Sequence, residues 1–165
     1  MIIRPETEGD RETIRQITEA AFAGQPYSDQ TEVRIIERLR AEGALTLSLV
    51  AVEDAEVIGH IAFSPVTITP VAAGWYGLGP VSVRPDRQGR GTGSSLVRQG
   101  LDRLRNIGAS GCVLAGNPAF YRRFGFRNDP ALVFAGCAPQ YFMVLPLSRT
   151  LVSGTVSYHP AFGPV

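Results

Sequence analysis

Residues 81–96 read VSVRPDRQGRGTGSSL, and this segment constrains the fold of the chain more than any other. Alternating apolar residues before Pro85 predict a strand, the glycines predict a loop, and the residues after Gly91 predict a helix. Glycine lets backbone amides approach a ligand with no Cβ in the way, and the first turn of a helix leaves its N–H groups free. The segment therefore predicts a phosphate or pyrophosphate site, to which Arg87 and Arg90 could add side-chain donors.

Two familiar phosphate-binding loops do not fit this segment. A Walker loop needs the sequence Gly-Lys-Ser/Thr, and all 16 basic residues of this chain are arginine. A dinucleotide fingerprint needs the spacing GxGxxG, and a match begun at Gly89 or Gly91 would put its third glycine at Ser94 or Leu96. Both observations weigh against a nucleotide-binding protein of either class.

The rest of the chain predicts a mixed α/β sheet around this loop. Apolar residues recur at helical spacing in some segments and at every second position in others. The first two helices have candidate caps at Thr7 or Asp10 and at Ser28 or Asp29, and the strand–helix–strand order of residues 75–115 predicts one parallel crossover. The predicted helices span about residues 10–23, 29–42, 91–106 and 118–123, and the predicted strands about residues 2–4, 45–51, 57–69 with a bend near Pro65, 75–83, 112–115, 141–147 and 155–158.

Composition narrows the class of protein. The chain has 165 residues and a net charge of +1, which suits one domain spanning residues 1–165 and argues against a general nucleic-acid binder. No apolar run reaches about 18 residues and no signal peptide is visible, so we expect no membrane association and a cytoplasmic location. The two cysteines, Cys112 and Cys137, do not have metal-ligand spacing, so no metal is expected.

Charge is unevenly distributed behind this neutral total. Residues 1–56 carry a net charge of −6 and residues 57–165 a net charge of +7. The arginines gather between Arg84 and Arg127, which favours an anionic ligand, although a solvated basic face would give the same pattern. The acidic N-terminal third favours a cationic ligand such as an amine.

Two motifs resemble those of the GNAT N-acetyltransferase family. Gln88-x-x-Gly91-x-Gly93 is similar to the family's Gln/Arg-x-x-Gly-x-Gly/Ala signature, and residues 117–126, NPAFYRRFGF, resemble its later Tyr-x-x-x-Gly-Phe element, with Tyr121 at the tyrosine position. The predicted order of elements matches the family over nearly the whole chain. The segment 78–83 and the tail YHPAF at residues 158–162 resemble the YhbS-type subgroup of that family.

The resemblance implies a GNAT fold, acetyl-CoA or CoA as co-substrate, and a set of site residues. Tyr121 would act as general acid toward the CoA thiolate, and the backbone amide of Val81 would polarise the acetyl carbonyl. The family places an asparagine and an alanine where this chain has Leu114 and Asn117, so Asn117 would substitute for the usual asparagine contact. The implied cofactor-binding residues are Val81, Val83, Gln88, Gly89, Arg90, Gly91, Thr92, Gly93, Ser94, Asn117, Phe120 and Tyr121.

The resemblance also implies direct acetyl transfer to a primary amine of a small molecule or peptide. A covalent route is disfavoured because Cys112 lies in an apolar strand and Cys137 has no recognisable base partner. The general base is not visible in the sequence; the candidates are a water chain, Tyr76, His60, His159, Asp29 and Glu32. Structural roles as core histidine or helix cap compete for these side chains.

Three alternatives stay open at the level of sequence. The chain could be a CoA- or acyl-CoA-binding regulatory module without catalysis, or it could transfer a longer acyl group. Its C-terminal strands could complete a sheet within the chain or exchange with a second copy to make a homodimer.

Overall fold

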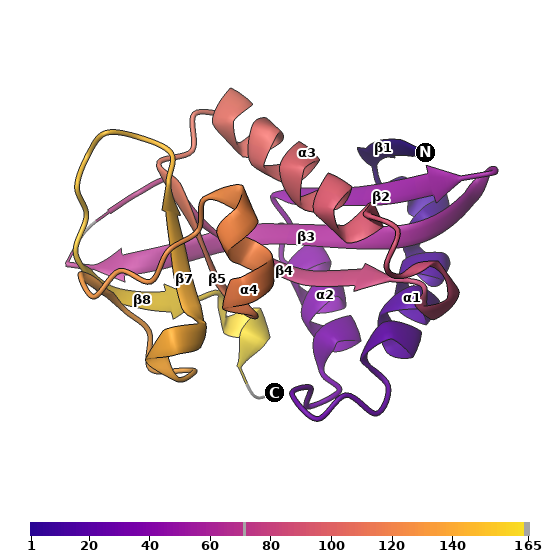
Figure 1. The fold of residues 1–165 in the computed structure, drawn as a ribbon, viewed down its shortest axis with the longest axis horizontal. Helices are drawn as coiled ribbons and strands as arrows, with labels where there is room; N and C mark the ends of the chain where they lie inside the picture. The colour runs from indigo at the N-terminus through magenta and orange to yellow at the C-terminus, as the bar shows by residue number, and fades with distance from the viewer. Residues whose placement is uncertain (71, 164–165) are drawn as a thin grey trace.

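One mixed β-sheet runs through the computed structural model, which describes residues 1–70 and 72–163 (Figure 1). Its strands are antiparallel except where β4 pairs with β5 and where the two-residue strand β6 pairs with β8. The continuous order is β1 (Ile2–Pro5), β2 (Leu47–Glu53), β3 (Glu56–Thr69), β4 (Trp75–Val83), β5 (Gly111–Ala115) and β7 (Phe142–Pro146), with β8 (Gly154–Tyr158) paired to β3 and to β6 (Leu132–Val133). The predicted mixed α/β sheet is confirmed.

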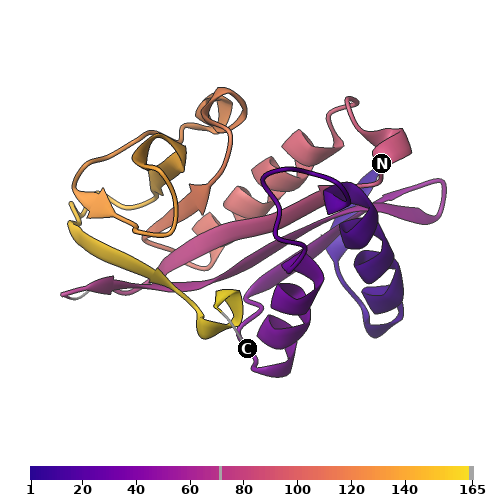
Figure 2. The ribbon, with the colours of Figure 1, turned by 90° about the horizontal axis from the view of Figure 1, so that it is seen from below.

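Two N-terminal helices, α1 (Arg11–Phe22) and α2 (Glu32–Ala41), pack on one face of the sheet, and α3 (Thr92–Asn106) covers the other (Figure 2). Thr7 and Asp10 form a capping box around the 3-10 turn before α1, as their sequence positions predict. The second helix begins later than predicted, because Ser28 bonds to Glu32 and Asp29 bonds to Thr31 within the preceding loop.

Strand β3 is long enough to serve two parts of the sheet. Residues up to Pro65 pair with β2 and β4, and residues Val66 to Thr69 pair with β8. The change of partner lies beside Pro65, where the sequence predicts a bend, because proline has no N–H to give to a ladder.

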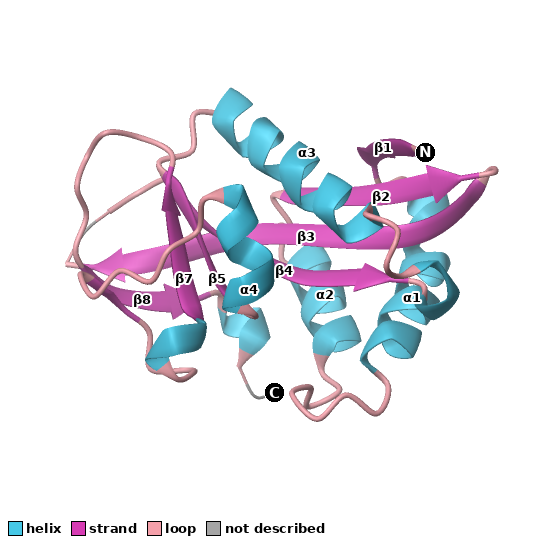
Figure 3. Ribbon diagram, in the orientation of Figure 1, coloured by secondary structure: helices cyan, strands magenta, loops and turns pink. Residues whose placement is uncertain are grey.

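The parallel crossover from β4 through α3 to β5 is confirmed (Figure 3). Leu96, Val97, Leu101 and Leu104 of α3 are buried against the sheet. Gly100 allows this close packing, because a methyl group there would collide with the ring of Phe63 on β3.

The C-terminal region contains one more strand than the sequence predicts. The predicted strands at 141–147 and 155–158 are present as β7 and β8, but β6 has only two residues and leaves no alternating pattern. Both β7 and β8 pair with strands of the same chain. The short turn Pro160–Phe162 then packs on α2, where Arg38 donates to the carbonyl of Ala161.

No helix in residues 1–70 and 72–163 is long and apolar enough to cross a membrane.

Candidate active site

The two parallel strands at the centre of the sheet separate after three residues. β4 pairs with β5 only from Trp75 to Gly77, opposite Gly111 to Val113. β4 then continues to Val83 while its other edge stays paired with β3, Val81 opposite Ile61 and Val83 opposite Gly59. The edge of β4 that faces β5 is therefore free of strand pairing after Gly77, which leaves backbone groups for an extended ligand.

The loop after β4 has the backbone conformation that its glycines predict. Gly89 and Gly91 have φ angles of 77° and 84°, in the left-handed region, and Gly91 is the residue that precedes α3. A methyl group on either would meet no atom within 4 Å, so backbone conformation and not space requires glycine. The amides of the first turn of α3 have no carbonyl one turn before them and suit an anion.

Thr92 and Ser94 lie in the first turn of α3, where their backbone amides have no helical partner. Both residues are buried. Thr92 packs against β3, because a methyl group on Gly59 would lie 3.3 Å from the Thr92 Cγ2 atom. Neither hydroxyl is engaged in a hydrogen bond within the described residues. The Gln88 side chain is engaged, because its Nε2 atom donates to the Val83 carbonyl at 2.9 Å and holds the loop to the end of β4.

The arginines around the loop differ in their availability. Arg87, which the sequence suggested as a phosphate donor, pairs with Glu53 of the β2–β3 hairpin at 2.5 Å. Arg84 pairs with Glu56 and Asp86. Arg90 is exposed on the loop itself, so it is the arginine of this group best placed to reach an anion there.

The helical segment after β5 approaches the same loop. A methyl group on Gly93 would lie 3.8 Å from Val83 Cγ2 and 3.9 Å from Phe120 Cζ, so β4, α3 and α4 (Pro118–Tyr121) meet at this point. This confirms that the two sequence motifs converge in space. Asn117, in contrast, uses its side-chain oxygen to cap α4 through the amide of Ala119 at 3.0 Å, and Leu114 is buried in the core.

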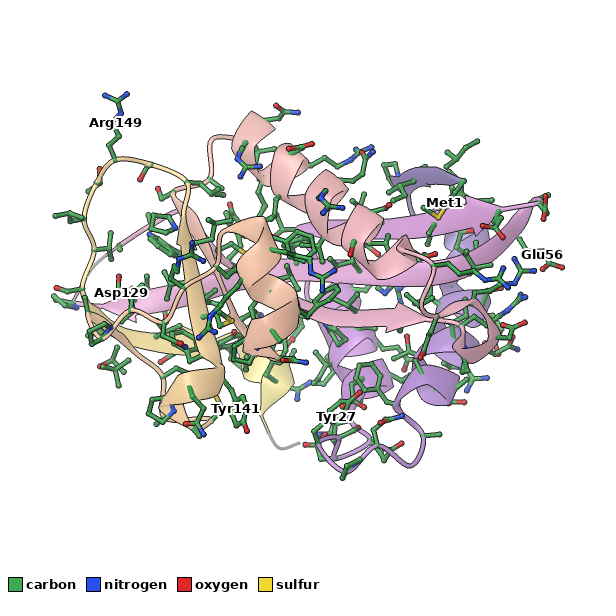
Figure 4. All side chains as sticks on the ribbon, viewed as in Figure 1. Met1, Tyr27, Glu56, Asp129, Tyr141 and Arg149 are labelled. Atoms are coloured by element: carbon green, nitrogen blue, oxygen red, sulfur yellow. The ribbon has the colours of Figure 1, made fainter. Side chains whose placement is uncertain are left out.

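Tyr121 ends α4 in a cluster of aromatic rings. Its ring makes edge contacts with Phe120 at a centroid distance of 4.9 Å and with Phe126 at 6.0 Å. Burial is the main cause that raises the pKa of Tyr121 to about 12, with smaller contributions in the same direction from Cys112 and Tyr27. The phenol therefore keeps its proton at neutral pH and can donate it. Figure 4 shows Tyr27 on the loop between α1 and α2.

His60 is a structural histidine rather than an accessible base. Its side chain is fully buried, and its Nε2 atom lies 2.7 Å from Ser48 Oγ. Ser48 in turn donates to Glu6, which forms two hydrogen bonds with Arg40 of α2. Burial lowers the pKa of His60 to about 4.

Three of the other candidate bases, His159, Glu32 and Asp29, accept hydrogen bonds from residues near them in the chain. His159 accepts a hydrogen bond from the amide of Ala161 at its Nδ1 atom, and Glu32 accepts one from Ser28. Asp29 accepts from Thr31, and this hydrogen bond lowers the pKa of its carboxyl group.

Neither cysteine is poised as a nucleophile. Burial raises the pKa of both the Cys112 and the Cys137 thiol, so both remain protonated at neutral pH. Within the described residues, no three His, Cys, Asp or Glu side chains are grouped as metal ligands.

Tyr158 is a residue near this opening that sequence reasoning did not single out. Its hydroxyl is buried and, in the part of the chain that the structure describes, makes no hydrogen bond. The ring lies against Gly77, where β4 and β5 separate. The tail sequence YHPAF begins with this tyrosine, but no pattern near it in the sequence indicates that the tail contacts β4.

Comparison with known proteins agrees with this geometry. The sequence model of the Acetyltransferase (GNAT) family matches residues 11–126. The N-acetyltransferase YhbS of Escherichia coli K12 is 38% identical over 169 residues, covering 98% of both chains, and the N-acetyltransferase YjhQ of the same organism is 31% identical over 124 residues, covering 72% of this chain and 65% of YjhQ.

Two solved structures extend the match to the fold. A GNAT family acetyltransferase from Brucella melitensis, in complex with acetyl-CoA, is 52% identical with a TM-score of 0.87 and covers 98% of this chain and 97% of its own. YhbS from Escherichia coli in complex with CoA is 34% identical with a TM-score of 0.89, covering 98% and 91%. Family model, full-length relatives and fold agree, and this chain belongs to the GNAT family of acetyltransferases.

Proposed function

We propose that this protein is an N-acetyltransferase that uses acetyl-CoA to acetylate a primary amine of a small molecule or peptide, with residues 1–165 acting as one domain. The observation that carries the proposal is the opening between β4 and β5, which begins after Gly77 and leads to the glycine loop before α3. The Brucella relative with 52% identity binds acetyl-CoA, and a ligand of that shape requires both an extended groove and an anion site.

The donor would bind along the free edge of β4. Backbone amides from Gln88 to Ser94 would hold the pyrophosphate, with Arg90 as the side chain nearest to it. The pantetheine arm would run beside Val83 and Val81, and Phe120 would cover it. The Val81 amide would then donate to the acetyl carbonyl oxygen as negative charge develops there.

Transfer needs one proton to leave the amine and one to reach sulfur. The ammonium form of the acceptor loses a proton to water, since the carboxylates near the first two helices are hydrogen-bonded to their own loop. The amine nitrogen then bonds to the carbonyl carbon, the carbon–sulfur bond breaks, and Tyr121 donates its proton to the leaving thiolate. Burial raises the pKa of the Tyr121 phenol, and the same desolvation would raise the pKa of the departing thiol, which favours protonation of the thiolate.

The donor site is tested by thermal unfolding with acetyl-CoA, CoA, NADH and ATP in parallel. A ligand at about 100 times its dissociation constant stabilises the protein by about 2.7 kcal/mol, a rise of roughly 5–11 °C for a chain of this size. We expect a shift with both CoA species and none with NADH. The absence of a shift with either CoA species would sink the proposal.

Catalysis is tested separately with a panel of primary amines, by following release of the CoA thiol. Tyr121→Phe should lower kcat about 100-fold or more and leave CoA affinity unchanged. If the wild-type protein binds CoA but acetylates no amine, with the panel extended to peptides, the chain is a CoA-binding module without this activity.

A further inference from the structure

The hydroxyl end of Tyr158 lies at the closed end of the opening between β4 and β5. A methyl group on Gly77 would fall 2.8 Å from Tyr158 Cε2 and 3.3 Å from Cδ2, so the ring carbon next to the hydroxyl-bearing carbon is the nearer one. Gly77 is also the last residue of β4 that pairs with β5, opposite Val113. Tyr158 is therefore placed where the unpaired edge of β4 begins.

This hydroxyl is buried without a partner. Among the described residues, Tyr158 Oη has no hydrogen bond and no contact with solvent. The ring itself is held firmly, with Phe134 at a centroid distance of 4.9 Å and Phe162 at 5.0 Å. Buried hydroxyls in folded proteins nearly always have a partner, so a rigidly placed one without a partner indicates a ligand or a water molecule.

Open space begins two residues further along β4. A methyl group on Gly79 would meet no atom within 4 Å, in contrast to the close packing at Gly77. Tyr121 flanks the other side, where its ring lies on Gly116 just after β5. Burial raises the pKa of Tyr158 above its usual range, so its hydroxyl keeps its proton and can donate a hydrogen bond.

We propose that the Tyr158 hydroxyl donates a hydrogen bond to the acyl carbonyl oxygen of the bound thioester donor. The inference rests on the donor site proposed above. A donor whose pyrophosphate lies at residues 88–94 and whose arm follows Val83 and Val81 carries its acyl group toward Gly77. The carbonyl oxygen is the polar acceptor at that end, and free CoA has no such group.

The test compares the affinities of acetyl-CoA and free CoA by titration calorimetry, so it needs no acceptor amine. The wild-type protein should bind acetyl-CoA more tightly than CoA. Tyr158→Phe keeps the ring and its packing, and should weaken acetyl-CoA binding roughly 3- to 10-fold while CoA affinity is unchanged. Tyr141→Phe, which removes the hydroxyl of a tyrosine that is 47% exposed, is the matched control and should change neither affinity.

Other results would overturn the inference. One is a wild-type protein that binds acetyl-CoA and CoA with equal affinity. Another is a Tyr158→Phe protein with the wild-type ratio of the two affinities. A third is an equal loss of affinity for both ligands in Tyr158→Phe, which would mean that the hydroxyl has a packing role. Ser64, opposite Gly77 on β3, has a second buried hydroxyl without a partner. Ser64→Ala should leave the ratio of acetyl-CoA to CoA affinity unchanged. If it weakens acetyl-CoA binding as Tyr158→Phe does, a water molecule held by both hydroxyls contacts the carbonyl oxygen instead of Tyr158. Failure of CoA itself to bind the wild type would instead refute the donor site.

Discussion

Tyr121 lies over Gly116 so closely that a methyl group on Gly116 would fall 2.6 Å from the Tyr121 Cε2 atom. Gly116 follows the last residue of β5, and its amide donates to the carbonyl of Tyr141 at 2.9 Å, which fixes the backbone at this point. Backbone contact and the surrounding aromatic rings therefore place the Tyr121 phenol beside the end of β5, where the proposed leaving group departs.

Gly116→Ala should displace the Tyr121 ring and lower kcat. A real Cβ cannot remain within 3 Å of a ring carbon, so ring or backbone must shift, and a shift of about 1 Å at a reacting group can cost about 100-fold in rate. Steady-state kinetics with an amine from the panel measures the loss. Gly9→Ala is the control, because its methyl group would come no closer than 3.8 Å to Thr7 Oγ1. An unchanged kcat in Gly116→Ala would mean that the ring position is not critical.

The glycine loop and the fold around it could be predicted from the sequence because their signals are local. Gly89 and Gly91 are required by backbone angles, and such positions show directly in the residue type. The amphipathic helices and alternating strands follow from periodicity in the same way. The predicted strand 75–83 has the bounds that the structure gives to β4.

The roles of several side chains could not be predicted, because their partners are distant in sequence. Arg87 was expected near a phosphate, but Glu53, on the neighbouring hairpin, holds it. Tyr158 contacts Gly77 only because β8 pairs with the far end of β3. Asn117 is predicted to contact the donor, and its side-chain oxygen also accepts from a free amide at the start of α4, a role that the sequence did not indicate.

Gly91→Ala should weaken CoA binding beyond its effect on stability. At a φ of 84° a Cβ costs about 1–2 kcal/mol, and relief of that strain would turn the loop amides away from the anion. Gly24→Ala is a matched control, since Gly24 has a φ of 71°, open space around it and no place in the loop. Urea unfolding should show similar losses of stability for both variants, while calorimetry shows weaker CoA binding only for Gly91→Ala. If Gly91→Ala and Gly24→Ala bind CoA with equal affinity, the loop is not part of the donor site.

The pH dependence of kcat should show no loss from ionisation of Tyr121 below about pH 11. The acid form of the phenol is the active one, and with a pKa of about 12 it persists through the range in which the amine acceptor becomes deprotonated. Wild type and Tyr121→Phe should therefore show the same rise in rate with pH, at different plateaus. Rates from pH 6 to 10.5, measured by product mass spectrometry, check this. A fall centred near pH 10 in the wild type alone would show an unshifted phenol.

His60 should make the protein less stable as the pH falls from about 6.5 to 4. Burial lowers the pKa of His60 to about 4, so the unfolded chain, with an ordinary histidine pKa near 6.5, binds more protons across this range. The stability contributed by neutral His60 is complete above about pH 6.5 and decreases by about 3 kcal/mol on approach to pH 4. Urea unfolding from pH 7 to 4.5 should show His60→Gln less stable at pH 7 but with a flatter pH dependence. His159→Gln, at a partly exposed side chain, is the control and should keep the wild-type slope; an equal slope in His60→Gln would assign the effect to other groups.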